Sequence, residues 1–388
     1  MVRSSAGVLG RMWQGMAQRE SARLRDAFVE RAVPAPSARA ALGQALAVLV
    51  ILVYAALSAV GLWWALVALG LWGEAHVFVR LLCALGGVGL LGFAWVARPR
   101  FPAPWGVEVT AEQAPQLHAL VAQVAGALDV RAPVRIVLTP EVNAFMARTG
   151  WRGTPTLGLG LGLWFGMRPQ ERVAVIAHEL AHLRSGDPTR SGVVAAALNV
   201  LDHAVSVLTP DAWMEYQAEH LQAVSNLMSR LMALVPLGVY SLMLNLVGAQ
   251  QQAAEFRADL LAARVAGSQA TAHALDRMYL ADLLDSALHK QWQRPEAPHV
   301  FAELRRMWDA ASPERWAKAR EEGQARNVRL DASHPPTADR LQVIGAWPRE
   351  AQIGLSDKSS GWLDVELGPF IPVLERAAID DYRVRMGG

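Results

Sequence analysis

Two long apolar runs near the N-terminus limit the fold of this chain more than any other feature. The first extends from Ala45 to Leu71 and the second from Val77 to Ala97, and Arg80 is the only charged residue in either run. A helix needs about 20 apolar residues to cross the hydrocarbon core of a bilayer. The first run begins too late and is too long for a signal peptide. With residues 73–76 as a short connector, the runs predict a transmembrane helical hairpin over residues 45–97.

The distribution of basic residues predicts the orientation of this hairpin. The segment before the first run carries seven arginines: Arg3, Arg11, Arg19, Arg23, Arg25, Arg31 and Arg39. Arg98 and Arg100 follow the second run, whereas the connector has no Lys or Arg. By the positive-inside rule, the basic N-terminal arm (residues 1–44) and the region after Arg98 face the cytoplasm, as in a multi-pass protein of a bacterial-type inner membrane. The net charge of +2 does not indicate nucleic-acid binding, and the single cysteine, Cys83, excludes a disulfide framework.

An HExxH motif lies further along the chain, inside an apolar helical pattern that starts near Pro169 and stops at Ser185. His178 and His182 are separated by four positions, so on a helix they share a face, with Cβ atoms roughly 5–6 Å apart. Both imidazoles can then reach one Zn²⁺, and Glu179 can reach a water bound to it. The alternative is a core helix with two incidental histidines. A buried Glu179 without a metal or a partner would be costly, so the metal site is favoured.

A third ligand is expected, because catalytic zinc sites usually take three protein ligands and leave one position for water. Glu255 and Asp259 lie four residues apart in a run from Gln250 to Ala266 that contains neither Gly nor Pro. Glu255 could complete the metal site. Asp259 could accept the second N–H of a ligand histidine and so fix its tautomer. A solvated helix face is the alternative.

The two motifs are followed by Ser333-His334-Pro335-Pro336-Thr337-Ala338-Asp339-Arg340, and preceded by Asn143-Ala144-Phe145. Together, in this order, they resemble the HtpX / CAAX prenyl protease family of integral-membrane zinc peptidases, over roughly Val107 to Ile344. The resemblance implies a zincin-like peptidase with one zinc ion per chain, held by His178, His182 and Glu255. It also implies that polypeptides are the substrates.

The same resemblance implies roles for the remaining motif residues. Glu179 would be the general base, and Asp259 would orient a ligand histidine. His334 and Arg340 would flank the site and support the oxyanion or its surroundings. A bland alternative is that His334-Pro335-Pro336 only ends a loop before a helix over residues 337–344. Residues Asn143, Ala144 and Phe145 would lie on the strand that aligns an extended substrate.

The rest of the chain predicts an α+β fold, mainly helical, with a small β-sheet. A helix is expected from Thr110 to Leu128 and a strand from Val134 to Leu138. A second strand, Thr156 to Trp164, is rich in glycine; its bare face either admits a substrate backbone or is simply buried. Residues 299–326 are charged and predict a surface helix pair that covers part of the cleft. The peptidase domain would cover residues 105–346, followed by a C-terminal extension, 347–388.

A hydrophobic insert at about residues 191–248 interrupts the peptidase domain. Two apolar stretches within it, Gly192 to Leu208 and Leu231 to Gly248, are short for full spans. If Glu255 shares a metal with His178 and His182, the chain crosses the bilayer an even number of times between them. Asp202 near a bilayer centre would be costly, which favours helices that pack on the catalytic domain and dip into the membrane.

These features predict a membrane-anchored zinc endopeptidase that hydrolyses membrane-associated or misfolded proteins. The alternative is a non-catalytic or signal-transducing membrane protein that keeps the zinc-peptidase fold. Signal transduction would need an extracytoplasmic sensing domain, for which residues 73–76 are too short. A scaffold would not need His178, Glu179, His182 and Glu255 to be intact.

Overall fold

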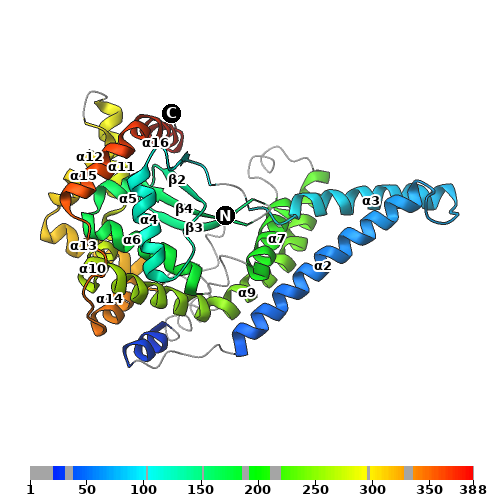
Figure 1. The fold of residues 1–388 in the computed structure, drawn as a ribbon. Coiled ribbons are helices and arrows are strands. Elements are labelled where there is room, and N and C mark those ends of the chain that lie inside the picture. Colours follow the sequence, from blue (N-terminus) through cyan, green and yellow to red (C-terminus); the bar gives the residue numbers. More distant parts are fainter. Residues whose placement is uncertain are drawn as a thin grey trace. The chain divides into compact units, whose positions relative to one another are not determined.

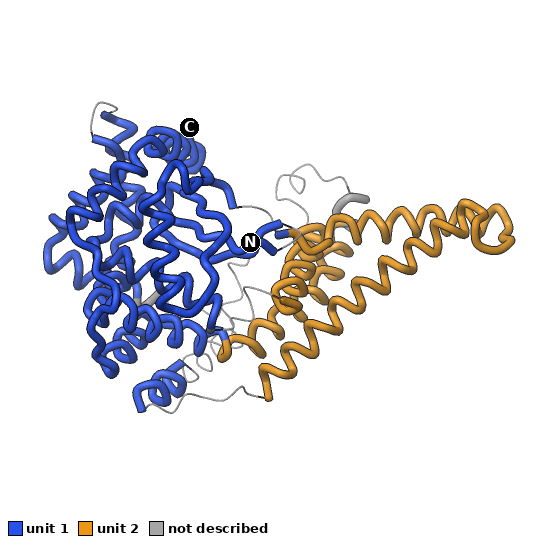
Figure 2. The backbone as a smooth tube through the Cα atoms, in the orientation of Figure 1, with its two compact units in different colours: residues 1–35, 101–187, 251–388 blue, residues 36–100, 188–250 orange. Residues whose placement is uncertain are grey.

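A computed structural model describes residues 21–30, 38–101, 104–150, 153–185, 192–209, 220–294, 298–326 and 335–387. The fold is mainly helical with one small mixed sheet, as the sequence predicts (Figure 1). The chain divides into two compact units, each built from separate stretches of sequence (Figure 2). One unit comprises residues 1–35, 101–187 and 251–388, and we call it the catalytic unit. The other, residues 36–100 and 188–250, is the membrane unit.

The membrane unit contains the predicted hairpin as helices α2 (Ala38–Ala68) and α3 (Val77–Ala97). Both are long and apolar enough to cross a bilayer. By length and composition so are residues 226–266 of α9 (His220–Ala266), a helix whose part up to residue 250 belongs to the membrane unit and whose remainder belongs to the catalytic unit. Helix α2 begins seven residues before the predicted span, because Ala-rich sequence continues the helix ahead of the apolar run. Tyr54 of α2 donates a hydrogen bond from its hydroxyl to the carbonyl of Ala94 on α3 at 2.9 Å, which ties the hairpin together.

Helix α7 (Gly192–Leu208) is too short to qualify as a span. Helix α7 packs against α2 and α3 within the membrane unit, and its expected packing on the catalytic domain stays a prediction. Apolar side chains from α2, α7 and α9 form a separate small core: Ala47, Val194, Ala197, Leu201, Met243 and Val247. Burial of this apolar stripe, together with the hydrogen bond from the backbone N–H of Arg100 to Asn199 Oδ1 at 2.6 Å, places α7 within the membrane unit.

The sheet of the catalytic unit has the strand order β1-β2-β4-β3. Its strands are β1 (Val107–Val109), β2 (Arg135–Thr139), β3 (Ala144–Thr149) and β4 (Thr154–Gly160). Strand β2 runs parallel to β4 and antiparallel to β1, and β3 runs antiparallel to β4. Strand β3 therefore forms one edge of the sheet among the described strands, and it lies beside α6 (Pro169–Ser185).

The structure shortens the predicted glycine-rich strand and decides between its two alternatives. The strand ends at Gly160, and residues Leu161–Gly166 form a short helix, α5. Its glycines are also not bare to a substrate, because β4 lies between β2 and β3. A Cβ atom on Gly158 would lie 2.2 Å from the ring of Phe145 on β3, and one on Gly160 would lie 2.1 Å from the carbonyl oxygen of Glu141. The glycines make room for neighbours in the core, which is the buried-strand alternative.

Helices surround this sheet and α6. Helix α4 (Pro115–Leu128) packs against α6. It starts five residues later than predicted, because residues 110–114 form a separate turn in which Thr110 donates its backbone N–H to the Gln113 side chain at 3.0 Å. The helices that follow α9 are α10 (Ser268–Arg277), the 3₁₀ turn η1 (Met278–Leu280), α11 (Leu283–Gln293), α12 (Val300–Asp309), α13 (Pro313–Arg326) and α14 (Thr337–Ala346).

The predicted surface helix pair corresponds to α12 and α13, and only α13 fits the prediction. Helix α12 places Phe301, Leu304 and Trp308 fully in the core. The C-terminal residues form α15 (Asp357–Leu367), η2 (Gly368–Phe370) and α16 (Ile371–Arg385), which belong to the same compact unit. A helix over residues 21–29, ahead of the membrane hairpin, is also part of the catalytic unit.

Candidate metal centre and active site

Helix α6 presents the HExxH motif from the middle of the catalytic unit. The helix begins at Pro169, as predicted, and the Glu171 carboxylate accepts a hydrogen bond from the backbone N–H of Arg168 at 2.8 Å. Val173, Ile176 and Leu180 are fully buried. The apolar stripe fixes the rotation of the helix, so that the face carrying His178 and His182 turns toward α9.

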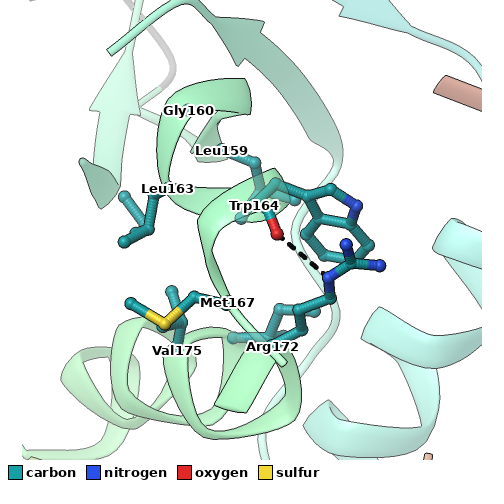
Figure 3. Close-up of a pocket in the computed structure, with 9 residues that line it drawn as sticks. Leu159, Gly160, Leu163, Trp164, Met167, Arg172 and Val175 are labelled. Carbon is teal, nitrogen blue, oxygen red and sulfur yellow. Dashed lines mark hydrogen bonds between the residues drawn. The ribbon is translucent and has the colours of Figure 1, made fainter. Parts of the chain in front are cut away.

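A buried arginine anchors the first turn of α6 (Figure 3). Arg172 donates from Nε to the carbonyl oxygen of Trp164 at 3.0 Å, and its guanidinium lies over the Trp164 ring, 4.6 Å from the ring centroid. The guanidinium also pairs with Asp364 of α15, with 2.7 Å between Nη1 and Oδ1, and with the Ser360 hydroxyl at 2.6 Å. Burial lowers the pKa of Arg172, and the Asp364 carboxylate opposes this effect. The C-terminal segment therefore helps to hold the motif helix.

Three side chains from α6 and α9 converge on one point. Nε2 of His178 and Nε2 of His182 are 3.3 Å apart. One oxygen of the Glu255 carboxylate lies 3.5 Å from Nε2 of His178, and the other lies 3.4 Å from Nε2 of His182. His182 and Glu255 are buried, with 6% and 0% of their surface exposed. Two imidazoles and a carboxylate arranged in this way can hold a metal ion.

Glu179 belongs to the same cluster. One ligand atom each from His178, Glu179 and His182 lie within 4.8 Å of one another. Glu179 is 6% exposed, and it lines the cavity described below. A carboxylate at this position is close to the metal-binding face and also open to a molecule in the cavity. It is placed to exchange a proton with a reacting group.

Asp259 lies one helical turn beyond Glu255 and contacts the far side of His178. Its Oδ1 is 3.0 Å from Nδ1 of His178, while Nε2 of the same ring faces Glu255. Arg340 of α14 binds Asp259 through two hydrogen bonds, from Nε at 2.7 Å and from Nη2 at 2.6 Å. Nη2 also lies 3.7 Å from Glu255. Arg340, Asp259 and His178 thus form a continuous chain, buried at Arg340 and Asp259, that ends at the candidate metal.

The charges around this chain favour a cation at His178. Burial alone lowers the pKa of the His178 imidazole, but hydrogen bonds to Asp259 and Glu255 outweigh it and raise the pKa to about 9. Burial also opposes the charge on Arg340, yet the carboxylates of Asp259, Glu255 and Glu179 raise its pKa above the ordinary value. The site therefore stabilises positive charge next to His178, which suits a bound metal ion as well as a proton.

A cavity of about 370 Å³ opens beside the cluster. His178, Glu179, Asp259 and Arg340 line one part of it, and Asn143 and Ala144, at the start of β3, line another. Phe145, predicted with them as a substrate-binding residue, is not among the lining residues, because its ring packs over Gly158. Among the described residues, two of the three predicted strand residues thus adjoin the cluster.

His334 lies outside the described residues. Its neighbour Pro335 is buried and lines the same cavity, as does Thr337 at the start of α14. The Ser333–Arg340 motif therefore reaches the cavity through Pro335, Thr337 and Arg340.

Several residues of the cavity wall carry no sequence signal that could have identified them. They come from α10, η1 and α13, and they include Thr271, Ala274, Leu275, Met278, Tyr279, Ala319 and Gly323. Gly323 allows the Tyr279 ring to pack closely, since a Cβ atom there would lie 2.4 Å from ring carbons of Tyr279. Only the folded chain brings these ordinary helix residues beside the HExxH motif.

Comparisons with known proteins agree with this geometry. A model of peptidase family M48 matches residues 111–348. Protease HtpX of Chromohalobacter salexigens is 29% identical over 231 residues, which cover 58% of this chain and 69% of that protein. A Protease HtpX homolog of Moorella thermoacetica is 40% identical over 84 residues, 21% of this chain and 27% of that protein. Protease HtpX of Nitrosococcus oceani is 26% identical over 269 residues, 66% of this chain and 76% of that protein. No solved structure matches significantly.

Proposed function

The chain belongs to peptidase family M48 and is a membrane-anchored metallopeptidase, and we propose that it is a zinc-dependent endopeptidase. The observation that carries this proposal is the convergence of three side chains. Nε2 of His178 and Nε2 of His182 are 3.3 Å apart, one Glu255 oxygen lies 3.5 Å from the first ring nitrogen, and the other oxygen lies 3.4 Å from the second. Ligands at the usual zinc distances of about 2.0–2.1 Å in a tetrahedral site lie about 3.3 Å from one another. The three side chains thus fit one zinc ion and leave a fourth position for water.

Zinc bound there would lower the pKa of its water to about 7 and polarise the substrate carbonyl. Glu179 is the proposed general base. It accepts a proton as the water oxygen bonds to the carbonyl carbon of the scissile peptide, and it donates that proton to the amine nitrogen as the C–N bond breaks. Its buried place at the cavity, within 4.8 Å of the histidine ligand atoms, supports this role.

Asp259 and Arg340 would orient His178 rather than react. Asp259 fixes the ring through Nδ1, and Arg340 fixes Asp259 through both carboxylate oxygens. With its donors directed at Asp259, Arg340 supports the surroundings of the oxyanion. A donor to the oxyanion itself is then best sought at His334, whose neighbour Pro335 lines the cavity.

The substrate would bind as an extended strand along β3. Ala144 begins this edge strand and Asn143 directly precedes it, and both line the cavity together with His178 and Glu179. An edge strand offers backbone N–H and C=O groups that can pair with a peptide of any sequence. The apolar cavity wall, from Leu275, Met278 and Ala319, would accept an apolar side chain. Membrane-associated or misfolded polypeptides, which expose such side chains, are the proposed substrates.

The catalytic unit is proposed to face the cytoplasm. The helix over residues 21–29 precedes α2 and belongs to the same compact unit as residues 101–187, so both ends of the α2–α3 hairpin lie on one side of the membrane. The arginines before and after the hairpin make that side cytoplasmic. Fusions test this: alkaline phosphatase should be active when inserted at Glu74, and green fluorescent protein should fluoresce at the C-terminus. The opposite pattern would overturn the orientation.

The central test compares wild-type protein, purified in detergent, with Glu179→Gln and His182→Ala on an unfolded casein-like substrate, with bound zinc measured in each. Wild type should cleave and hold about one zinc per chain. Glu179→Gln should keep the zinc and lose cleavage, whereas His182→Ala should lose both. Cleavage by Glu179→Gln at the wild-type rate would overturn the assignment of the general base. Absence of zinc from the wild type would overturn the proposed mechanism.

A further inference from the structure

The helix over residues 21–29, which we call the N-terminal helix, packs on the rest of the catalytic unit through one face. Ser21, Leu24 and Phe28 are buried, with Phe28 0% exposed, whereas Arg23 and Asp26 on the other face are exposed. Burial at every third or fourth position is what a docked amphipathic helix shows. Residues 21–29 are therefore a structural part of the catalytic unit and not merely a charged arm.

Its polar contacts reach the first turn of α14. The Ser21 hydroxyl donates to one oxygen of the Asp339 carboxylate at 3.0 Å, and Nη1 of Arg25 donates to the other oxygen at 3.0 Å. Both oxygens of Asp339 are thus held by the N-terminal helix. Asp339 directly precedes Arg340, whose guanidinium binds Asp259. Fixing Asp339 therefore fixes the turn that carries Arg340.

Its apolar contacts reach α9 beside a metal ligand. The ring of Phe28 packs on the ring of Phe256, with centroids 5.4 Å apart, and Phe256 is fully buried. Phe256 directly follows Glu255. The indole N–H of Trp347, just after α14, donates to the backbone carbonyl of Phe28 at 2.9 Å. The N-terminal helix consequently bridges α9, which provides Glu255 and Asp259, and α14, which provides Arg340.

We propose that this helix is a positioning element of the metal centre, acting through Asp339 and Phe256 on the residues that support the zinc ligands. The inference rests on the proposed zinc site. Loss of a group that orients a metal ligand typically weakens metal binding by about 10–100-fold. Arg25 and Ser21 act through Asp339, Arg340 and Asp259 in turn, so their removal should have an effect at the lower end of that range.

The test measures zinc release from full-length, detergent-purified protein to a chromophoric chelator. The variants are Arg25→Ala, Ser21→Ala with Arg25→Ala, Asp339→Ala, and Arg25→Ala with Asp339→Ala. Arg23→Ala, on the exposed face of the same helix, is the matched control. Release should be about tenfold faster than wild type in the double Ser21/Arg25 variant and unchanged in the control. The effects of Arg25→Ala and Asp339→Ala on the rate of zinc release should not add in the combined variant, because both substitutions remove the same interaction.

A second readout separates positioning from general stability. The N-terminal helix does not line the cavity, so kcat should fall and KM should stay near the wild-type value, and Arg25→Lys should restore part of the loss. Wild type that holds zinc while every variant releases it at the wild-type rate would overturn this inference alone. Equal acceleration by Arg23→Ala would also overturn it. A wild type without zinc would overturn the proposed function and this inference together.

Discussion

Arg340 binds Asp259 through both carboxylate oxygens, with Nε 2.7 Å from Oδ2 and Nη2 2.6 Å from Oδ1. The two residues are far apart in the sequence and lie on different helices, and both are buried. A planar guanidinium paired in this way holds a carboxylate in one orientation. Because Asp259 contacts Nδ1 of His178 at 3.0 Å, the pair determines which way the candidate ligand ring faces.

Asp259→Asn should therefore weaken zinc binding by about 10–100-fold, while the protein still folds. An amide cannot accept from Arg340 through both of its polar atoms, so the support of His178 is lost although the ring remains. Zinc affinity can be measured by competition with a chelator of known affinity.

The matched control is Asp285→Asn. Asp285 makes a similar double interaction with Arg385, at 2.9 and 3.3 Å, on an exposed part of the catalytic unit away from the cluster. Its replacement should leave zinc affinity unchanged. An Asp259→Asn protein that binds zinc as tightly as this control would show that Asp259 does not orient the ligand.

Gly160→Ala should destabilise the catalytic unit. A Cβ atom at Gly160 would lie 2.1 Å from the carbonyl oxygen of Glu141 and 2.5 Å from that of Asn143, so backbone would have to move. Overpacking of this kind costs typically about 1–3 kcal/mol. Because Asn143 lines the cavity, peptidase activity should fall as well.

Gly126→Ala is the control for this substitution. Gly126 is exposed on α4, and nothing lies within 4 Å of a Cβ atom placed there. Alanine in an exposed helix should stabilise the protein by about 0.5–1 kcal/mol. Thermal unfolding in one detergent would measure both changes. A Gly160→Ala protein as stable as wild type would contradict the close packing of Gly160 on the backbone of Glu141 and Asn143, just before β3.

The sequence predicts local chemistry well, because that chemistry depends on short spacings. His178 and His182 are i and i+4 on a helix that begins where Pro169 predicts it, and Glu255 and Asp259 repeat the same spacing on α9. Packing across the fold is not encoded in short spacings. The glycines of β4 are compatible with an open face and with a face covered by a neighbouring side chain. Only the pairing of β3 with β4, which places the Phe145 ring over Gly158, decides between these alternatives.

The N-terminal helix and α12 show why charge content misleads. Arg25 is one of several arginines that predict a basic arm, yet its partner Asp339 is 314 positions away. Helix α12 contains Arg305 and Arg306, which favour a surface position, but Phe301, Leu304 and Trp308 share its opposite face and are buried. An amphipathic helix can be charged and still contribute large side chains to a core.

Arg172→Met should destabilise the catalytic unit by about 1–3 kcal/mol, because Arg172 is buried and its acceptors lose their donor, while its partner Asp364 is partly exposed. Met has similar length, but it removes the Arg172 donors to the Trp164 carbonyl and the Ser360 hydroxyl. It also removes the charged partner of Asp364, which keeps the hydrogen bond from the Trp164 indole N–H at 2.9 Å. Chemical denaturation would measure the loss. Arg172→Met combined with Asp364→Leu should recover part of it, since both charges are then removed; no recovery would indicate that the pair does not link α6 to α15.

His299 predicts a pH dependence of stability outside the metal site. Its Nδ1 accepts a hydrogen bond from the backbone N–H of Ala302 at 3.2 Å at the start of α12, and Phe165 and Phe301 pack around its ring. Burial lowers the pKa of His299 below its ordinary value of 6.5, although the charges of Glu375 and Asp364 oppose this effect. Protonation would also remove the acceptor and place a positive charge at a helix N-terminus, which is unfavourable.

Because the pKa of His299 is lower in the folded protein, the folded protein becomes less stable as the pH falls. The unfolded chain takes up a proton at His299 near pH 6.5, whereas the folded chain resists it to lower pH, so the stabilisation is complete above pH 6.5 and is lost as the pH falls through that range. Thermal unfolding between pH 7.5 and 5.5 would test this in wild type and in His299→Asn, which keeps a side-chain acceptor for the helix but does not titrate. The melting temperature should fall further in wild type than in the variant. Equal falls in the two proteins would show that the pKa of His299 does not change on unfolding.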